Sequence, residues 1–277
     1  VSLELNLPFS LDQLHFHKSM EFMGPFSKLF CPGGLENPLV LMGNQFKPYL
    51  LMTRTFTLLI LGIYLLNDLR IVKKNIRTIC LGLLILSHVI IPQAMMIAAR
   101  VTPENHALAH DGGTIQMEES MRMLLNGKNP YTHSFHGTPL ENWRGFTNNV
   151  VHHVPYMPGS FLYTIPFFGL TQILGVPYDQ RMVYMILFLV SFPLISLICP
   201  AGYGRRLAFA VFGLNPFFVR YFQLGANDIM IGFLLLLTLV FFNKNMKTAG
   251  FTALAAACAV KQFAWFFVPF LTINQLN

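Results

Sequence analysis

The sequence contains few charged residues for its length, and this shortage is its most informative feature. Only 11% of its 277 residues are Asp, Glu, Lys or Arg, whereas 54% are hydrophobic, and the mean hydropathy is +0.52. About a quarter of the residues in an ordinary soluble domain are charged. The composition therefore excludes an ordinary soluble domain and predicts a membrane protein.

Cysteine is also scarce, and the spacing of the cysteines excludes two common kinds of site. The four cysteines show no CxxC spacing, and three of them lie within apolar segments. Neither a disulfide framework nor a thiolate metal site is indicated. The sequence also lacks an internal repeat, a low-complexity tract and an HExxH motif.

The net charge of +7 raises the question of nucleic-acid binding. The basic residues gather in short connections between apolar segments, as expected for retention on the cytoplasmic side of a membrane. We therefore predict no nucleic-acid partner. The partner that this composition predicts is the lipid bilayer.

Apolar blocks recur along the chain, and each is close to the ~20 residues that a helix needs to cross a bilayer. We therefore expect an all-α fold, a polytopic bundle of transmembrane helices. Segment 159–176 is also apolar, but Pro166 interrupts it, so we expect it to be re-entrant or interfacial. The predicted spans are 49–66, 78–99, 182–200, 207–222, 229–243 and 249–273.

The basic residues predict which connections face the cytoplasm. The connection after the first span contains mainly basic residues, and two later connections contain Arg205 with Arg206 and Lys244 with Lys247. By the positive-inside bias these connections are cytoplasmic. The long loop 100–158 then lies outside.

The chain divides into two parts on this topology. Residues 1–48 form an external N-terminal segment, and residues 49–277 form the transmembrane domain; we expect both to belong to a longer chain. Apolar and polar residues alternate over 1–9, which is typical of a strand. A small β element is expected there, at a sheet edge because Pro8 cannot donate a backbone hydrogen bond.

The long external loop is predicted to contain an amphipathic helix. Thr114 is the expected N-cap, and Glu118 and Glu119 follow in the first turns, where the helix dipole favours negative charge. Glu118 is expected to pair with Arg122 at i,i+4. The helix would lie on the outer membrane surface with its glutamates on a solvated face, unless Glu118 contacts a substrate.

Asp111 precedes this helix, beside His110 and before two glycines that leave its carboxylate unobstructed. A partly desolvated carboxylate can act as a general base toward a hydroxyl, or can hold a divalent cation such as Mg²⁺ or Mn²⁺. The alternative is a turn aspartate that caps the helix. His106 and His110 have helical spacing, but no complete set of zinc ligands is identifiable.

Lys261 interrupts an apolar run, and an ionisable residue inside a span is a functional-site hypothesis. It would lie about 21 Å along the helix from Lys247, close to Asp228 at the outer surface, where it could meet a phosphate. The alternative is a lysine whose side chain extends to the headgroups. Asp228 after Asn227 is either part of this site or a helix cap. Arg220 is either a second phosphate partner or an interfacial anchor.

The order of these motifs resembles that of the GT-C type glycosyltransferases, in particular the bacterial enzymes that depend on polyprenyl-phosphate-mannose. The resemblance covers about residues 78–277, and each motif is short, so their order and placement carry it. The predicted span at 49–66 and the N-terminal segment depart from the commonest layout of the family. The matching motifs are Asp111 and residues 127–131, 156–159, 225–228 and 261–262.

The resemblance implies an integral membrane enzyme in the bacterial plasma membrane, with its active site on the outer face. Such an enzyme transfers a sugar, a mannose-like hexose or a pentose, from a polyprenyl-phosphate donor to a hydroxyl of a glycan, lipid or protein. Asp111 would be the essential acid and Asp228 the second acidic position. We assign substrate binding to His110, Glu118, Asn129, Tyr131, His153, Tyr156, Arg220, Asn227, Lys261 and Gln262, and no residue to a metal site.

Two other functions are compatible with the sequence. In a transporter or flippase-like protein, Asp111, Asp228 and Lys261 would line a pathway for an anionic lipid or solute, and broken spans in matching halves would support it. In a structural membrane subunit, the external loop would bind a partner protein, and no catalytic activity would depend on Asp111.

Overall fold

The computed structural model describes residues 43–68, 76–101, 112–141 and 149–276. All of them belong to one compact unit, Pro38–Asn277. Helices and turns account for the described residues, and no strand occurs among them. The prediction of an all-α fold is confirmed for this part of the chain. The β element predicted at 1–9 lies outside it.

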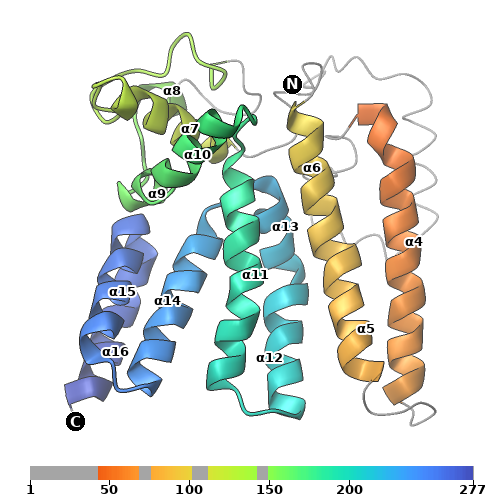
Figure 1. Ribbon diagram of the computed structural model, residues 1–277. Coiled ribbons are helices and arrows are strands. Elements are labelled where there is room, and N and C mark those ends of the chain that lie inside the picture. The colour runs from red at the N-terminus through yellow and green to blue at the C-terminus, as the bar shows by residue number, and fades with distance from the viewer. Residues whose placement is uncertain (1–42, 69–75, 102–111, 142–148, 277) are drawn as a thin grey trace, which may run out of the picture. The chain divides into compact units, whose positions relative to one another are not determined.

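Apolar helices form most of the unit, and four shorter helices gather at one end of them (Figure 1). The apolar helices are α4 Gly43–Asp68, α5 Ile76–Ile85, η1 Leu86–Ile90, α6 Ile91–Val101, α11 Gln180–Ile198, α12 Tyr203–Leu214, α13 Pro216–Leu224, α14 Asp228–Asn243, α15 Lys247–Val260, η3 Gln262–Phe267 and α16 Val268–Leu276. We call the four others the cap helices: α7 Gly112–Leu125, α8 Asn149–His152, α9 Gly159–Leu162 and α10 Ile165–Leu174.

Two helical segments of the described residues are long and apolar enough to cross a membrane. They are Ile76–Ala98, which combines α5, η1 and most of α6, and Gln180–Ile198, which is α11. A third exists if the bent pair α12 and α13 counts as one span. These segments agree with the spans predicted at 78–99, 182–200 and 207–222, and they indicate a protein associated with a membrane.

The span predicted at 207–222 is bent rather than straight. Helix α12 ends at Leu214, and α13 begins at Pro216 at an angle of 45° to it. Pro216 has no N–H to continue the first helix, and the Asn215 side chain accepts hydrogen bonds from the N–H groups of Phe217 and Phe218. Asn215 therefore caps a new helix.

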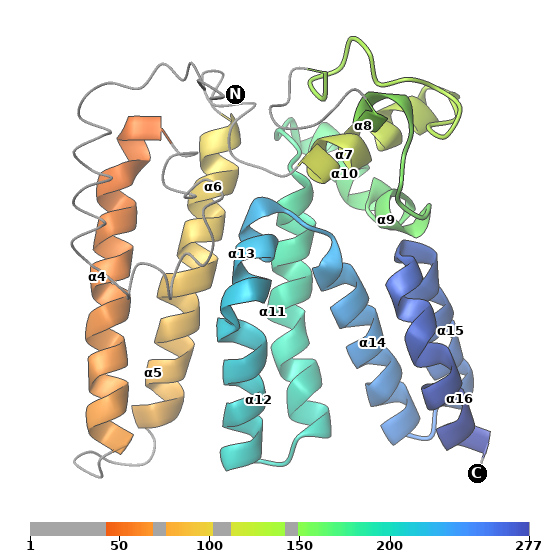
Figure 2. The ribbon, with the colours of Figure 1, turned by 180° about the vertical axis from the view of Figure 1, so that it is seen from behind.

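The prediction of a single span at 249–273 is wrong. Helix α15 ends at Val260, Lys261 has extended backbone angles (φ −158°, ψ 141°), and η3 starts at Gln262. The two ribbon views show that the chain reverses there, because α16 ends at the opposite end of α15 from Lys261 (Figures 1 and 2). Lys261 therefore lies at a turn between two helical segments and not in the middle of a helix.

The cap helices and the basic connections lie at opposite ends of the apolar helices. Both views show α12 and α15 beginning at one end, which we call the basic end, and the cap helices at the other (Figures 1 and 2). Segment 159–174, which contains α9 and α10, lies with α7 and does not run alongside the long helices. This arrangement agrees with the prediction that the segment is re-entrant or interfacial.

One hydrophobic core joins the cap helices to the long helices. It contains Met117 and Met121 from α7, Phe161 from α9, and Phe188 and Phe222 from α11 and α13. The Phe188 ring lies 4.8 Å from that of Phe222, measured between centroids. Because a shared core resists independent movement of its parts, the cap helices have a defined position on the long helices.

Candidate functional site

Helix α7 begins at Gly112, directly after Asp111, and it is buried as far as Met121, whereas Arg122 and Leu125 near its end are exposed. Residues 113–121 are all buried, and Glu118 and Glu119 are only 2% and 8% exposed. The predictions of a surface helix and a solvated glutamate face are therefore wrong. The reason is that α7 packs against α9 and α11. His110 and Asp111 lie outside the described residues.

Thr114 connects α7 to the turn before α14. Its hydroxyl donates a hydrogen bond to the Gly225 carbonyl oxygen (2.9 Å), and the two residues are 111 positions apart in the sequence. The prediction that Thr114 is the N-cap is wrong, because α7 starts two residues earlier. The start of α7 therefore lies against the turn 225–227.

Gly225 permits this close approach. Its φ of +95° is in the left-handed region, and a Cβ atom there would lie 2.4 Å from Thr114 Oγ1 and 3.1 Å from Arg181 Cγ. A side chain would therefore be both strained and obstructed. Position 225 therefore requires glycine for two reasons: the positive φ of the turn and the close contact with Thr114.

Asp228 and Lys261 form an ion pair at the cap end of α14 and α15. Lys261 Nζ donates to Asp228 Oδ1 at 2.8 Å and lies 3.5 Å from Asn227 Oδ1. The side chains of Lys261 and Asp228 are 34% and 49% exposed, so a ligand can reach both. The predicted proximity of Asp228 and Lys261 is confirmed. Asn227 is buried, and its Nδ2 atom has no hydrogen-bond partner among the described residues.

The start of α9 packs against the end of α15, next to Lys261. A Cβ atom on Gly159 would lie 2.6 Å from the Ala259 carbonyl oxygen, so the two backbones are in direct contact. The Tyr131 hydroxyl donates a hydrogen bond to the Tyr156 carbonyl oxygen (2.8 Å). Three motifs predicted separately, around residues 131, 156 and 261, are therefore close together in space.

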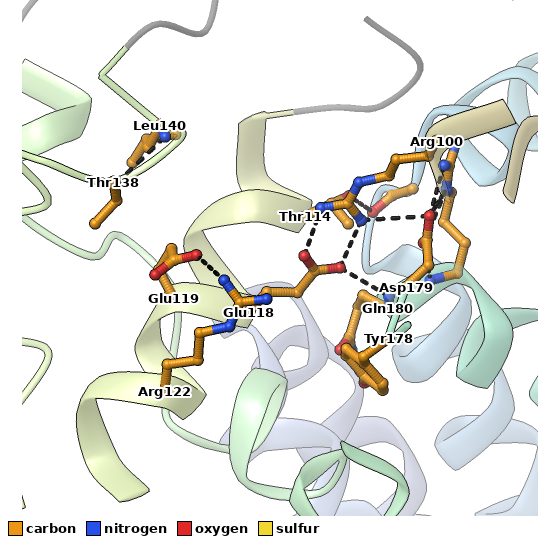
Figure 3. A network of polar contacts seen from close by, with 12 residues as sticks. Arg100, Thr114, Glu118, Glu119, Arg122, Thr138, Leu140, Tyr178, Asp179 and Gln180 are labelled. Carbon is orange, nitrogen blue, oxygen red and sulfur yellow. Dashed lines mark hydrogen bonds and ion pairs between the residues drawn. The ribbon is translucent and has the colours of Figure 1, made fainter. Parts of the chain in front are cut away.

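Four charged side chains form a network beside α7 that we call the buried charge cluster: Arg100, Glu118, Asp179 and Arg181. Figure 3 labels the first three of them. Each is at most 5% exposed. Arg100 donates to both carboxylate oxygens of Glu118, at 2.7 and 2.5 Å, and Arg181 donates to Asp179 at 2.7 Å. Two cations face two anions, so the cluster is neutral, as burial of charge requires.

The arginines lower the pKa of the Asp179 carboxyl. Burial alone would raise the pKa of Asp179, but the charges and hydrogen bonds of Arg181 and Arg100 outweigh it and hold that pKa well below its ordinary value. Glu119 differs, because burial raises its pKa and only Arg122, at 2.6 Å, opposes this strongly. The predicted ion pair between Glu118 and Arg122 is wrong, because Arg122 pairs with Glu119 and Glu118 pairs with Arg100.

Glu118 is not available to a substrate, contrary to the prediction. Its carboxylate accepts hydrogen bonds from Arg100 and from the Gln180 backbone N–H (2.9 Å), and it is almost fully buried. Sequence reasoning did not assign Arg100, Asp179 or Arg181 to the site. The signal for the last two was present, since both charges stand directly before the apolar run of α11.

The remaining predicted residues of the described ranges lie in the cap or near Lys261 and Gly225. Asn129 accepts a hydrogen bond from the Tyr131 backbone N–H (3.0 Å), and the His153 carbonyl oxygen accepts one from the Gln116 side chain (2.7 Å). Gln262 is exposed beside Lys261, and Arg220 is partly buried in α13, which ends at Gly225. The contacts of Asn129 and His153 shape the cap.

Within the described ranges, no group of three or more His, Cys, Asp or Glu side chains could hold a metal ion. His106, His110 and Asp111 lie outside those ranges. Comparisons with models of protein families, with curated protein sequences and with solved structures found no match to this chain. The site is therefore described by its residues alone: a cation paired with an acid, next to the start of a buried helix.

Proposed function

We propose that the protein is a membrane glycosyltransferase of the GT-C type. It transfers a mannose-like hexose or a pentose from a polyprenyl-phosphate donor to an acceptor hydroxyl. One observation carries the proposal: the start of α7, the turn before Asp228, and Lys261 come together at the end of the apolar helices opposite the basic end. The positive-inside bias makes this the outer end.

The reaction assigns a separate task to each charged group. The acceptor oxygen attacks the anomeric carbon of the sugar, and the bond from that carbon to the phosphate oxygen breaks, with its electron pair passing to the phosphate. Asp111 takes the proton of the acceptor hydroxyl as a general base. Lys261, with Arg220 as a second cation, neutralises the charge on the departing polyprenyl phosphate.

The ion pair refines the role proposed for Asp228. A carboxylate 2.8 Å from Lys261 Nζ orients that cation and balances its charge when no phosphate is bound. Tyr156 and His153 lie in the chain segment that leads to Gly159, and Gly159 packs beside Lys261. In the proposal this segment borders the sugar.

The test uses full-length protein reconstituted in liposomes with radiolabelled polyprenyl-phosphate sugars. Transfer and release of the lipid phosphate are measured for the wild type, Asp111→Asn and Lys261→Ala. We expect Asp111→Asn to lower transfer by about 10² to 10⁴-fold, the usual contribution of a general base. Matched controls are Glu141→Gln, an exposed acid in the cap, and Lys244→Ala at the basic end, both with wild-type rates. Transfer by Asp111→Asn at the wild-type rate would refute the assignment.

A carrier of anionic lipids is the second candidate, because two of the apolar segments are interrupted, at Asn215 and at Lys261. Broken helices in transporters line substrate sites. A carrier would move the labelled lipid across the bilayer without releasing lipid phosphate. The same liposomes therefore distinguish the two functions.

A further inference from the structure

The pair Arg100 and Glu118 joins the two ends of a chain segment. Arg100 is in the last turn of α6 and Glu118 is in the middle of α7, and the intervening residues include Asp111. We propose that Arg100 and Glu118 are positioning residues for the transfer reaction, which hold α7 in the orientation that Asp111 needs. This inference rests on the proposed function.

The cost of burial indicates that the pair has a role other than stability. Removing two charges from water costs several kcal/mol per ion, and apolar residues of similar volume in place of a buried pair are often neutral or stabilising. A bidentate arginine and carboxylate pair, however, fixes both distance and angle, which apolar contacts do not. The presence of a charged pair at this buried position therefore favours a requirement for a fixed orientation of α7.

The contacts of the cluster fix α7 at two points. Glu118 is held by Arg100 and by the backbone of Gln180, and Thr114, one helical turn earlier, is held by Gly225. Positions i and i+4 lie on the same face of a helix. The first half of α7, which follows Asp111 in the sequence, is therefore attached at two points on one face.

Arg181 connects this attachment to the rest of the site. Its guanidinium donates to the carbonyl oxygens of Met96 (3.2 Å) and Gln223 (3.4 Å), and its side chain lies against Gly225. The Gly225 turn leads directly to Asp228, which holds Lys261. The buried charge cluster thus fixes the position of the start of α7 relative to the turn before Asp228.

Glu118 acts through α7 and not on the substrate, since it is 2% exposed and accepts three hydrogen bonds. Its removal should therefore affect the rate of transfer more than the binding of the lipid donor, which depends on Lys261. A displacement of about 1 Å in a catalytic group can cost on the order of 10²-fold in rate.

The experiment removes the pair without leaving an unpaired charge. In Arg100→Met/Glu118→Met the pair Asp179 and Arg181 remains, so the cluster stays neutral. We expect kcat to fall at least about tenfold, while the KM for the polyprenyl-phosphate sugar changes less than about twofold. Glu119→Gln/Arg122→Gln, which removes the neighbouring ion pair of the same helix, is the matched control and should keep the wild-type kcat.

Arg100→Lys is a milder second variant, because it keeps the charge but cannot make the bidentate contact. It should lower kcat, while the KM for the polyprenyl-phosphate sugar changes less than about twofold. Hydrogen exchange of the α7 backbone amides, measured on the same liposomes, needs no activity and should be faster in Arg100→Met/Glu118→Met than in the control.

The outcomes separate the two proposals. An unchanged kcat in both Arg100 variants, or unchanged exchange in α7, overturns the positioning role. A wild type that releases no lipid phosphate refutes the glycosyltransferase, and the exchange data still decide whether the pair holds α7.

Discussion

At the residue scale, two ion pairs a short distance apart have different consequences. The pair of Asp228 and Lys261 is partly exposed, and such pairs typically contribute about 0.2–1 kcal/mol. The pair of Arg100 and Glu118 is buried, and loss of one partner of a buried pair costs roughly 3–5 kcal/mol. Asp228 and Lys261 can therefore exchange partners with a ligand, whereas Arg100 and Glu118 cannot.

Glu119 leads to a prediction about pH. Because burial raises its pKa in the folded protein, the folded state binds this proton more tightly than the unfolded state does. The stability contributed by the protonated form is present at low pH and is lost as pH rises through the folded pKa. Glu119→Gln, which does not titrate, should therefore gain thermal midpoint relative to the wild type at pH 8 and gain less at pH 4.5. Thermal unfolding in detergent at both pH values measures this, and a larger gain at pH 4.5 would contradict it.

At the scale of elements, glycines decide how the helices meet. Gly159 allows α9 to contact the end of α15, and Gly225 allows the turn before α14 to contact α7. Both contacts involve atoms that a Cβ would displace. The ends of α14 and α15, which carry the candidate site, can therefore contact α7 and α9 closely because glycine has no side chain at these two positions.

Gly225→Ala should destabilise the protein more than Gly175→Ala does. Both glycines have positive φ, +95° and +66°, which costs a non-glycine residue about 1–2 kcal/mol, but a Cβ meets Thr114 Oγ1 only at Gly225. Thermal midpoints of the two variants should differ by several degrees. Thr114→Ala in the Gly225→Ala background should recover part of the difference, because it removes the obstructing hydroxyl; equal midpoints for the two glycine variants would contradict this.

At the scale of the whole molecule, the cap helices and the basic end have different chemical character. The basic end carries Arg205, Arg206, Lys244 and Lys247, whereas the candidate site lies at the opposite end, next to the cap helices. From the positive-inside bias we propose that the protein lies in a membrane with the cap outside.

This orientation is measured by labelling single cysteines in a variant without the native cysteines. Ser134→Cys in the cap should react with an impermeant thiol reagent applied to intact cells. Thr248→Cys at the start of α15 should react only after the membrane is opened. Both positions are exposed, so access alone does not separate them. Labelling of both from outside would place the basic end outside and contradict the topology.

The sequence by itself determined the helical class and the apolar segments at 78–99, 182–200 and 207–222, and it predicted the side on which the basic connections lie. Composition and the period of apolar residues are local properties, and the length of a membrane-crossing helix follows from the thickness of the bilayer. The pairing of Asp228 with Lys261 was also predictable, because each charge stands alone beside an apolar run, and a charge in such surroundings needs a partner.

Only the tertiary structure decided the rest. The reversal at Lys261 and the burial of α7 as far as Met121 depend on which surfaces pack together, and a buried helical segment can have the same sequence pattern as one on a membrane surface. Glu118 of the buried charge cluster contacts Gln180, 62 positions away, and Arg181 contacts Met96, 85 positions away, and no local pattern specifies these contacts. Long-range contacts of this kind are set by packing and charge neutrality in the folded protein, so the role of Glu118 could be read only from its neighbours.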